Sequence, residues 1–108
     1  MCTSIVEVVP ADGMAKSAKG WFPVTTSVVA YDHARHALEG DVITLDFINS
    51  ELPPGARAAV ELTLESAKAL HAALARAIAE AEIEEAERVE SIERLHSAVA
   101  ARTIRSAA

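Results

Sequence analysis

The feature that most constrains the fold is a C-terminal segment with no helix breaker. After Gly55 the sequence contains no glycine or proline, and alanine, glutamate, arginine and leucine fill most positions of residues 64–108. Along this segment the apolar residues keep one helical phase, interrupted mainly by Glu85 and Arg88. They are Leu70, Leu74, Ile78, Ala81, Val89, Ile92, Leu95 and Val99. The pattern predicts one continuous helix, roughly 60 Å long at about 1.5 Å per residue.

Upstream of the helix, four segments alternate apolar and polar residues as β-strands do. They are residues 3–9, 21–31, 41–48 and about 56–62. Residues 11–20 are small and contain two glycines and two lysines, so we expect an exposed loop there. Four consecutive strands followed by a helix predict an α+β fold. In this fold a four-stranded antiparallel sheet carries one long C-terminal helix, which packs on one face and extends beyond it.

The alternation also predicts how the strands divide their side chains between the two faces of the sheet. One face would be apolar and would pack on the helix. The other would be polar without being highly charged, and such a face is solvated, forms a dimer surface or binds a ligand. Its expected residues are Glu7, Thr25, Ser27, Tyr31, Thr44, Asp46 and Glu61.

The distribution of charge along the helix indicates self-association. Seven of the sixteen acids lie between Glu80 and Glu93, whereas only arginines occur among the charged residues from Arg94 onward. Two copies with this asymmetry can pair in antiparallel orientation around the apolar stripe. We therefore expect residues 1–81 to form the core domain and residues 82–108 to be a helical extension that makes a homo-oligomer, such as a dimer. The alternatives are a bend near residues 82–85 that folds the tail back, or a frayed tail.

Composition excludes several classes of partner. The net charge is −6, and the ten lysines and arginines are scattered among the acids, so no basic face is available for nucleic acid. No apolar run approaches the roughly 18 residues of a membrane span, and the N-terminus lacks the pattern of a signal peptide. Cys2 is the only cysteine, which excludes an internal disulfide. We expect a soluble cytoplasmic protein with no nucleic-acid or membrane partner.

One cluster of residues between the second and third strands has the composition of a metal site. Asp32 precedes His33 and His36, and Glu39 follows three residues later. On a helical turn His33, His36 and Glu39 would share one face and bind one divalent ion, and Cys2 is a further ligand if the first strand brings it close. This set of ligands suits zinc, iron, nickel or copper, so the spacing alone does not identify the metal.

The cluster supports more than one function. With three protein ligands the ion keeps an open position and polarises a substrate oxygen or activates water, while Asp32 orients a histidine from outside the coordination sphere. The prediction is thus a small metal-binding protein, or a metal-dependent enzyme that acts on a small molecule. In a competing interpretation the segment is a polar loop whose histidines are exposed or pair with Glu39 and Asp41. Two further alternatives are a metal-free enzyme that uses Cys2 or a histidine, and a non-catalytic oligomerising module.

Five segments resemble a family of small bacterial proteins with a domain of unknown function. They are the opening MCT, GWFPVTT at residues 20–26, DHARHA at 32–37, LDFIN at 45–49 and PGARAAVEL at 54–62. The resemblance covers about the first 80 residues, and the tail from about Glu82 is an addition to it. The family pattern includes the leading cysteine, both histidines and a Glu-His pair, where this chain has Glu39 and Gly40. The resemblance therefore implies roles for Cys2, His33, His36 and Glu39, and it implies no particular activity.

Overall fold

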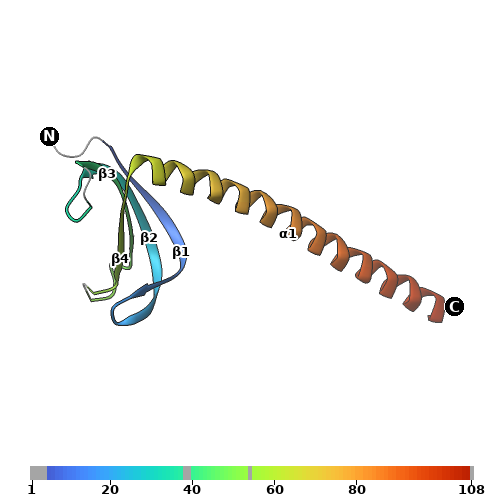
Figure 1. Cartoon of the computed structure of the whole chain (residues 1–108). Helices are drawn as coiled ribbons and strands as arrows, with labels where there is room; N and C mark the ends of the chain where they lie inside the picture. The colour runs from blue at the N-terminus through green and yellow to red at the C-terminus, as the bar shows by residue number, and fades with distance from the viewer. Residues whose placement is uncertain (1–4, 38–39, 54, 108) are drawn as a thin grey trace. The chain divides into compact units, whose positions relative to one another are not determined.

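A sheet and a helix make up the chain. The computed structural model describes residues 5–37, 40–53 and 55–107, and the chain divides into two compact units, Met1–Ala69 and Leu70–Ala108. The elements, shown in Figure 1, are β1 (Ile5–Ser17), β2 (Gly20–His33), β3 (Asp41–Ile48), β4 (Arg57–Leu62) and α1 (Leu64–Ala107). The predicted α+β fold with four strands and one long C-terminal helix is confirmed. The packing of the helix on the sheet, and the functional boundary after residue 81, stay predictions.

The strands form one sheet in the order β1-β2-β3-β4, with every neighbouring pair antiparallel. The expectation of a loop over residues 11–20 is wrong, because β1 continues through this segment to Ser17. The ladder shifts its register between Pro10 and Gly13, and the pairing with β2 resumes beyond the shift. A bulge of this kind absorbs an irregular residue without ending the strand. Backbone pairing with β2 thus overrides the loop-like composition of these residues.

A two-residue turn closes the first hairpin at the point where β1 meets β2. Ser17 and Gly20 are the last paired residues, and the Ser17 hydroxyl donates a hydrogen bond to the Gly20 carbonyl oxygen at 3.1 Å. The same hydroxyl oxygen accepts the Lys19 backbone N–H at 3.2 Å. Gly20 has a φ of 114°, a conformation that glycine adopts without a steric penalty. Gly20 therefore begins a strand where its glycine identity alone suggested a loop.

The register of the strands divides the polar residues between both faces of the sheet. Thr44 lies opposite Ala30 on one side and Glu61 on the other, and Asp46 lies opposite Val28. Directly opposed residues in antiparallel strands point to the same face, so these five side chains share a face that we call the Glu61 face. The prediction of a single polar face is therefore wrong. Four residues of the expected polar face lie on the opposite face, which also contains Ile43, Leu45 and Phe47. These four residues are Glu7, Thr25, Ser27 and Tyr31.

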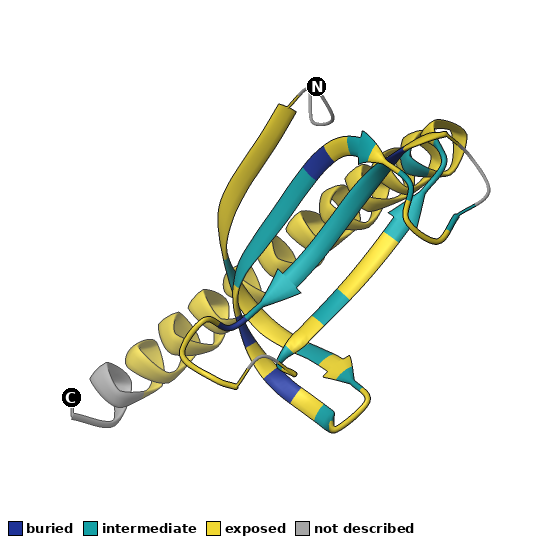
Figure 2. Cartoon of the chain, turned by 90° about the vertical axis from the view of Figure 1, so that its left-hand side faces the viewer, coloured by how far each residue is buried: buried dark blue, intermediate teal, exposed yellow. Residues whose placement is uncertain are grey.

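The buried apolar residues belong to the Glu61 face. Phe22, Val24 and Ala30 alternate on the same side of β2, and Val42 of β3, opposite Asp32, is completely buried. Figure 2 shows the buried positions in dark blue on the strands. Burial of these side chains is the main apolar contribution to the stability of the sheet. The core therefore lies on the same face as the polar residues of β3 and β4.

Two polar residues fix the ends of elements near β4. Asn49 is buried, donates from Nδ2 to the Pro23 carbonyl oxygen at 3.0 Å and accepts the Glu51 backbone N–H at 3.0 Å. Thr63 is the N-cap of α1, because its Oγ1 accepts the Ser66 backbone N–H at 3.2 Å. From Leu64 the helix is uninterrupted, including the segment 82–85 where a bend was the alternative.

Candidate functional site

A pocket of about 470 Å³ opens on the Glu61 face, beside the loop that connects β2 and β3. Its size falls in the range of small-molecule sites. The lining combines acidic with basic side chains and also has apolar surface. It consists of Asp32, His33, Arg35, His36, Thr44, Asp46, Arg57, Ala59, Val60 and Glu61. The pocket therefore contains three of the predicted site residues, Asp32, His33 and His36.

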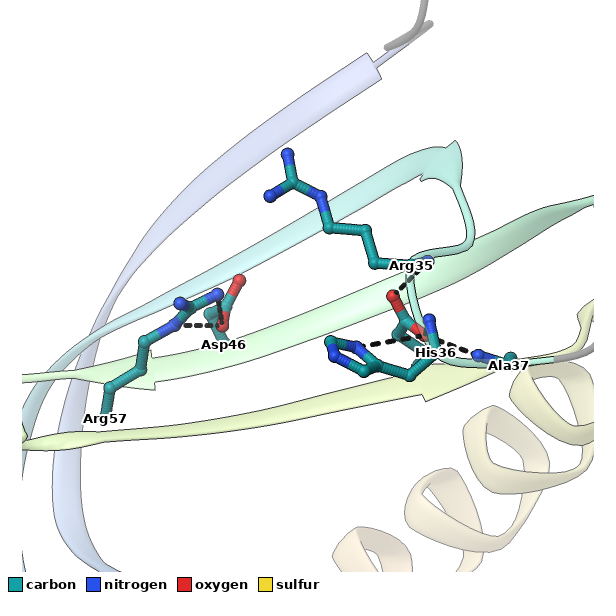
Figure 3. A network of polar contacts seen from close by, with 6 residues as sticks. Arg35, His36, Ala37, Asp46 and Arg57 are labelled. Atoms are coloured by element: carbon teal, nitrogen blue, oxygen red, sulfur yellow. Dashed lines mark hydrogen bonds and ion pairs between the residues drawn. The ribbon is translucent and has the colours of Figure 1, made fainter.

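Glu61 of β4 holds the first part of the β2–β3 loop in place. Its carboxylate accepts the backbone N–H groups of Arg35 at 2.8 Å, His36 at 2.8 Å and Ala37 at 2.9 Å, as Figure 3 shows from close by. Three consecutive amides directed at one carboxylate make an anion-binding arrangement. These bonds, with that of Arg35 the largest contribution, lower the pKa of Glu61 and outweigh the opposing effect of burial. Residues 35–37 are therefore held in a defined conformation.

His33 is held by an acid on the neighbouring strand. It is the last residue of β2, its Cα partner is Asp41, and its Nδ1 lies 2.6 Å from the Asp41 Oδ1. A carboxylate accepts hydrogen bonds, so Nδ1 carries a proton, and in the neutral imidazole Nε2 then carries the lone pair. Asp32 makes a different contact, because its Oδ1 accepts the backbone N–H of His33 at 2.7 Å. The acid that orients the imidazole is thus Asp41.

His36 projects from the loop that Glu61 anchors. Its side chain is 90% exposed, and its Nδ1 lies 3.9 Å from Oε1 of Glu61. This distance is too long for a hydrogen bond but short enough for attraction when the ring is protonated. In Figure 3 the ring extends from the loop towards the side on which Asp46 and Arg57 lie. In the described part of the chain no contact engages Nε2 of either histidine.

An ion pair between β3 and β4 forms another part of the pocket. Nε and one terminal nitrogen of Arg57 both lie 2.8 Å from Oδ1 of Asp46. The hydrogen bond and the charge of Asp46 raise the pKa of Arg57. The two charges offset each other, so this part of the pocket is polar without a net charge.

Sequence reasoning recognised the local cluster and missed its partners from β4. Glu61 follows the loop residues that it binds by 24 to 26 positions, so no local spacing reveals the contact. Arg57 was not among the predicted site residues. The alternation of β4 was the one available signal, because it placed Arg57 and Glu61 on the same side of that strand.

The backbone conformation at the predicted metal cluster is extended and then bent. The helical turn on which the three ligands would share one face is not formed by the described residues, since His33 ends β2 and residues 35–37 form a bend. Glu39 and Cys2 lie outside the described residues. Within the described ranges, no group of three His, Cys, Asp or Glu side chains is placed to hold one metal ion. His33 and His36 thus both line the pocket, His33 from a position whose register partner Asp41 lies on the face opposite Glu61, and the described residues supply no third ligand.

Glu61→Gln is expected to loosen the anchored loop at neutral pH. A carboxamide has one acceptor oxygen and no charge, so it cannot hold the three amides of Arg35, His36 and Ala37 equally well. Because the folded-state pKa of Glu61 is lowered, the stabilisation is present above the ordinary carboxyl pKa of about 4.3 and is lost as pH falls through the lowered value.

Amide hydrogen exchange at these three residues measures the effect. The wild-type protein should protect the amides more than the Glu61→Gln variant at pH 7, and the difference should shrink below about pH 4. Glu7→Gln is the matched control, because Glu7 is exposed on β1. Equal protection in the wild-type protein and Glu61→Gln at pH 7 would show that the carboxylate does not anchor the loop.

The comparison with protein families agrees with the resemblance noted in the sequence. The chain belongs to a family of unknown function, DUF6295, whose model matches residues 1–87. The match includes the whole sheet and the pocket. No curated protein and no solved structure matches the chain. Within the described residues, no helix is long and apolar enough to cross a membrane.

Proposed function

We propose that the protein binds a divalent transition-metal ion at the pocket, with Nε2 of His33 and Nε2 of His36 as ligands. The observation that carries the proposal is the hydrogen bond of 2.6 Å between Nδ1 of His33 and Asp41. Histidines that bind metals commonly donate their second ring N–H to a carboxylate, which selects the tautomer and increases the basicity of the coordinating nitrogen. His33 already has this partner without a metal.

The binding of residues 35–37 by Glu61 supports the second ligand. His36 follows Arg35 in the bend whose amides Glu61 binds, so the backbone that carries its ring is held before any ion arrives. Preorganised ligands bind more tightly because less conformational entropy is lost on binding. The negative charge of Glu61 near Nδ1 of His36 also favours a cation in this region.

The third ligand of the proposed site is Glu39 or Cys2. The imidazole, carboxylate and thiolate groups together suit zinc, iron, nickel or copper. An ion with three protein ligands keeps one position for water or for an oxygen of a small molecule in the pocket. The function proposed is therefore metal binding with a small-molecule ligand, and catalysis would use the open position.

Elemental analysis of untagged protein purified without chelator tests the proposal. The wild-type protein should contain near-stoichiometric metal, and His33→Ala with His36→Ala should contain almost none. His71→Ala with His96→Ala is the matched control, because these two histidines lie on α1 and outside the pocket. Cys2→Ser and Glu39→Gln then measure whether either residue is a ligand. Absence of metal from the wild-type protein, even after reconstitution with zinc, iron, nickel and copper, would overturn the proposal.

A further inference from the structure

The helical unit exposes a continuous series of large apolar side chains. Between Leu70 and Arg102 every large aliphatic residue is exposed in the single chain, from 46% for Leu70 to 63% for Leu95. The full set is Leu70, Leu74, Ile78, Ile83, Val89, Ile92, Leu95 and Val99. Single exposed apolar residues are common, whereas the members of this set other than Ile83 share one side of the helix, and an aligned series of this length marks a surface that another molecule covers.

The spacing of residues along one side of α1 is that of a two-stranded coiled coil. Starting at Leu74, steps of four and three residues alternate without a break to Val99. We call these eight positions the seam: Leu74, Ile78, Ala81, Glu85, Arg88, Ile92, Leu95 and Val99. Only its two central members are charged, and in the single chain Arg88 forms an ion pair with Glu85 of the same helix. Both side chains are well exposed, at 67% and 62%.

We infer that α1 pairs with α1 of a second copy in antiparallel orientation, with Glu85 of each helix opposite Arg88 of the other. In a parallel pair, identical seam positions meet, so the two Glu85 carboxylates would face each other and the two Arg88 guanidinium groups would do the same. Like charges in a partly desolvated seam are strongly unfavourable. The antiparallel arrangement replaces both repulsive contacts with two attractive ones.

The antiparallel register that matches the charges also matches the apolar residues. When Glu85 lies opposite Arg88 of the second copy, the helices cross midway between residues 86 and 87. Ile78 then lies opposite Leu95 of the second copy, and Leu74 lies opposite its Val99. The small Ala81 lies opposite Ile92. Every apolar seam position thus meets an apolar partner, and the two-fold symmetry closes the assembly at a dimer.

This interface goes beyond the proposed metal site. The pocket uses residues of the sheet unit up to Glu61, whereas the seam lies wholly in Leu70–Ala108. Arg88 and the rest of the seam after it lie beyond the family match, which ends at residue 87. The dimer and the metal site can therefore be tested separately.

Charge reversal in the seam tests the pairing by sedimentation equilibrium. The wild-type protein should be a dimer. Glu85→Arg should raise its dissociation constant about a hundredfold, because the new arginine of each helix then lies opposite Arg88 of the other helix. The double exchange Glu85→Arg with Arg88→Glu restores opposite charges at both contacts, so it should restore the dimer. Glu87→Arg is the matched control, since it makes the same change of charge outside the seam.

The outcomes separate pairing from loss of folding. Near-UV circular dichroism, which reports mainly on the sheet unit through Trp21 and Tyr31, should be unchanged in all three variants. A monomeric wild-type protein at about 100 µM, far above the Kd of specific dimers, would overturn the inference. Unchanged association of Glu85→Arg, or failure of the double exchange to restore the dimer, would also overturn it.

Disulfide formation tests the orientation directly. In a Cys2→Ser background, Leu74→Cys mixed with Val99→Cys should give a crosslinked heterodimer under mild oxidation, because these positions lie opposite each other. Val99→Cys alone should not crosslink, since the two copies of this position would be about 38 Å apart along the antiparallel helices. Efficient crosslinking of Val99→Cys alone would show a parallel pair and would contradict the inferred register.

Discussion

Phe22→Ala is expected to destabilise the sheet by about 3–5 kcal/mol, the largest stability effect of the changes considered for this chain. Phe22 is 6% exposed and lies on the Glu61 face beside Val24. Its truncation removes the largest apolar side chain of the small core and leaves a cavity that the remaining residues cannot fill. Since small domains have about 5–15 kcal/mol of stability in total, the variant should be close to unfolding.

Trp21→Ala is the matched control for this prediction. Trp21 is the adjacent aromatic residue of β2, on the opposite face, and it is 66% exposed. Urea denaturation followed by far-UV circular dichroism should show a large fall of the midpoint for Phe22→Ala and a much smaller one for Trp21→Ala. Equal falls for the two variants would mean that the core does not lie on the Glu61 face.

Asp41→Asn is expected to weaken metal binding about 10–100-fold, on the proposed function. The carboxylate of Asp41 accepts the Nδ1 proton of His33, and a neutral carboxamide accepts it less strongly. The imidazole then loses both its preferred tautomer and part of the basicity of Nε2. The coordinating nitrogen remains present, so the affinity should fall without being abolished.

Competition with a chelator of known affinity measures the change for Asp41→Asn. Asp12→Asn, a change of the same chemistry at an exposed position of β1, should bind metal as tightly as the wild-type protein. If Asp41→Asn binds metal as tightly as the wild-type protein, Asp41 does not orient the imidazole of His33 for metal binding. Loss of metal affinity in both variants would show that the overall negative charge of the protein, and not the orientation of His33 by Asp41, determines the affinity.

Local sequence patterns correctly predicted the type and order of the elements. Residues 64–108 predicted the helix because propensity and apolar phase agree over many turns, and α1 covers Leu64–Ala107. The third strand was also predicted at its observed bounds, Asp41–Ile48. The failure over residues 11–20 has a physical cause. These residues have weak local preferences, and pairing with β2 determines their structure.

The faces of the sheet could not be predicted from alternation alone. Within a strand the alternation of side chains is local, and it was correct for each strand. Which face of one strand joins which face of the next depends on register, and a shift of one residue exchanges the two faces. The pairing of Thr44 with Ala30 therefore places Thr44 on the face opposite Ser27, although the two were expected to share a polar face.

The same distinction holds for the candidate site. The sequence by itself determined that Asp32, His33 and His36 lie within one short segment, because chain connectivity keeps them close. It also determined that the seam residues of α1 lie on one side of the helix, because the geometry of a helix depends only on local spacing. Only the tertiary structure decided that Glu61 binds the loop and that Asp41 orients His33. These contacts depend on strand register and on long-range backbone pairing, which link residues that no sequence spacing relates.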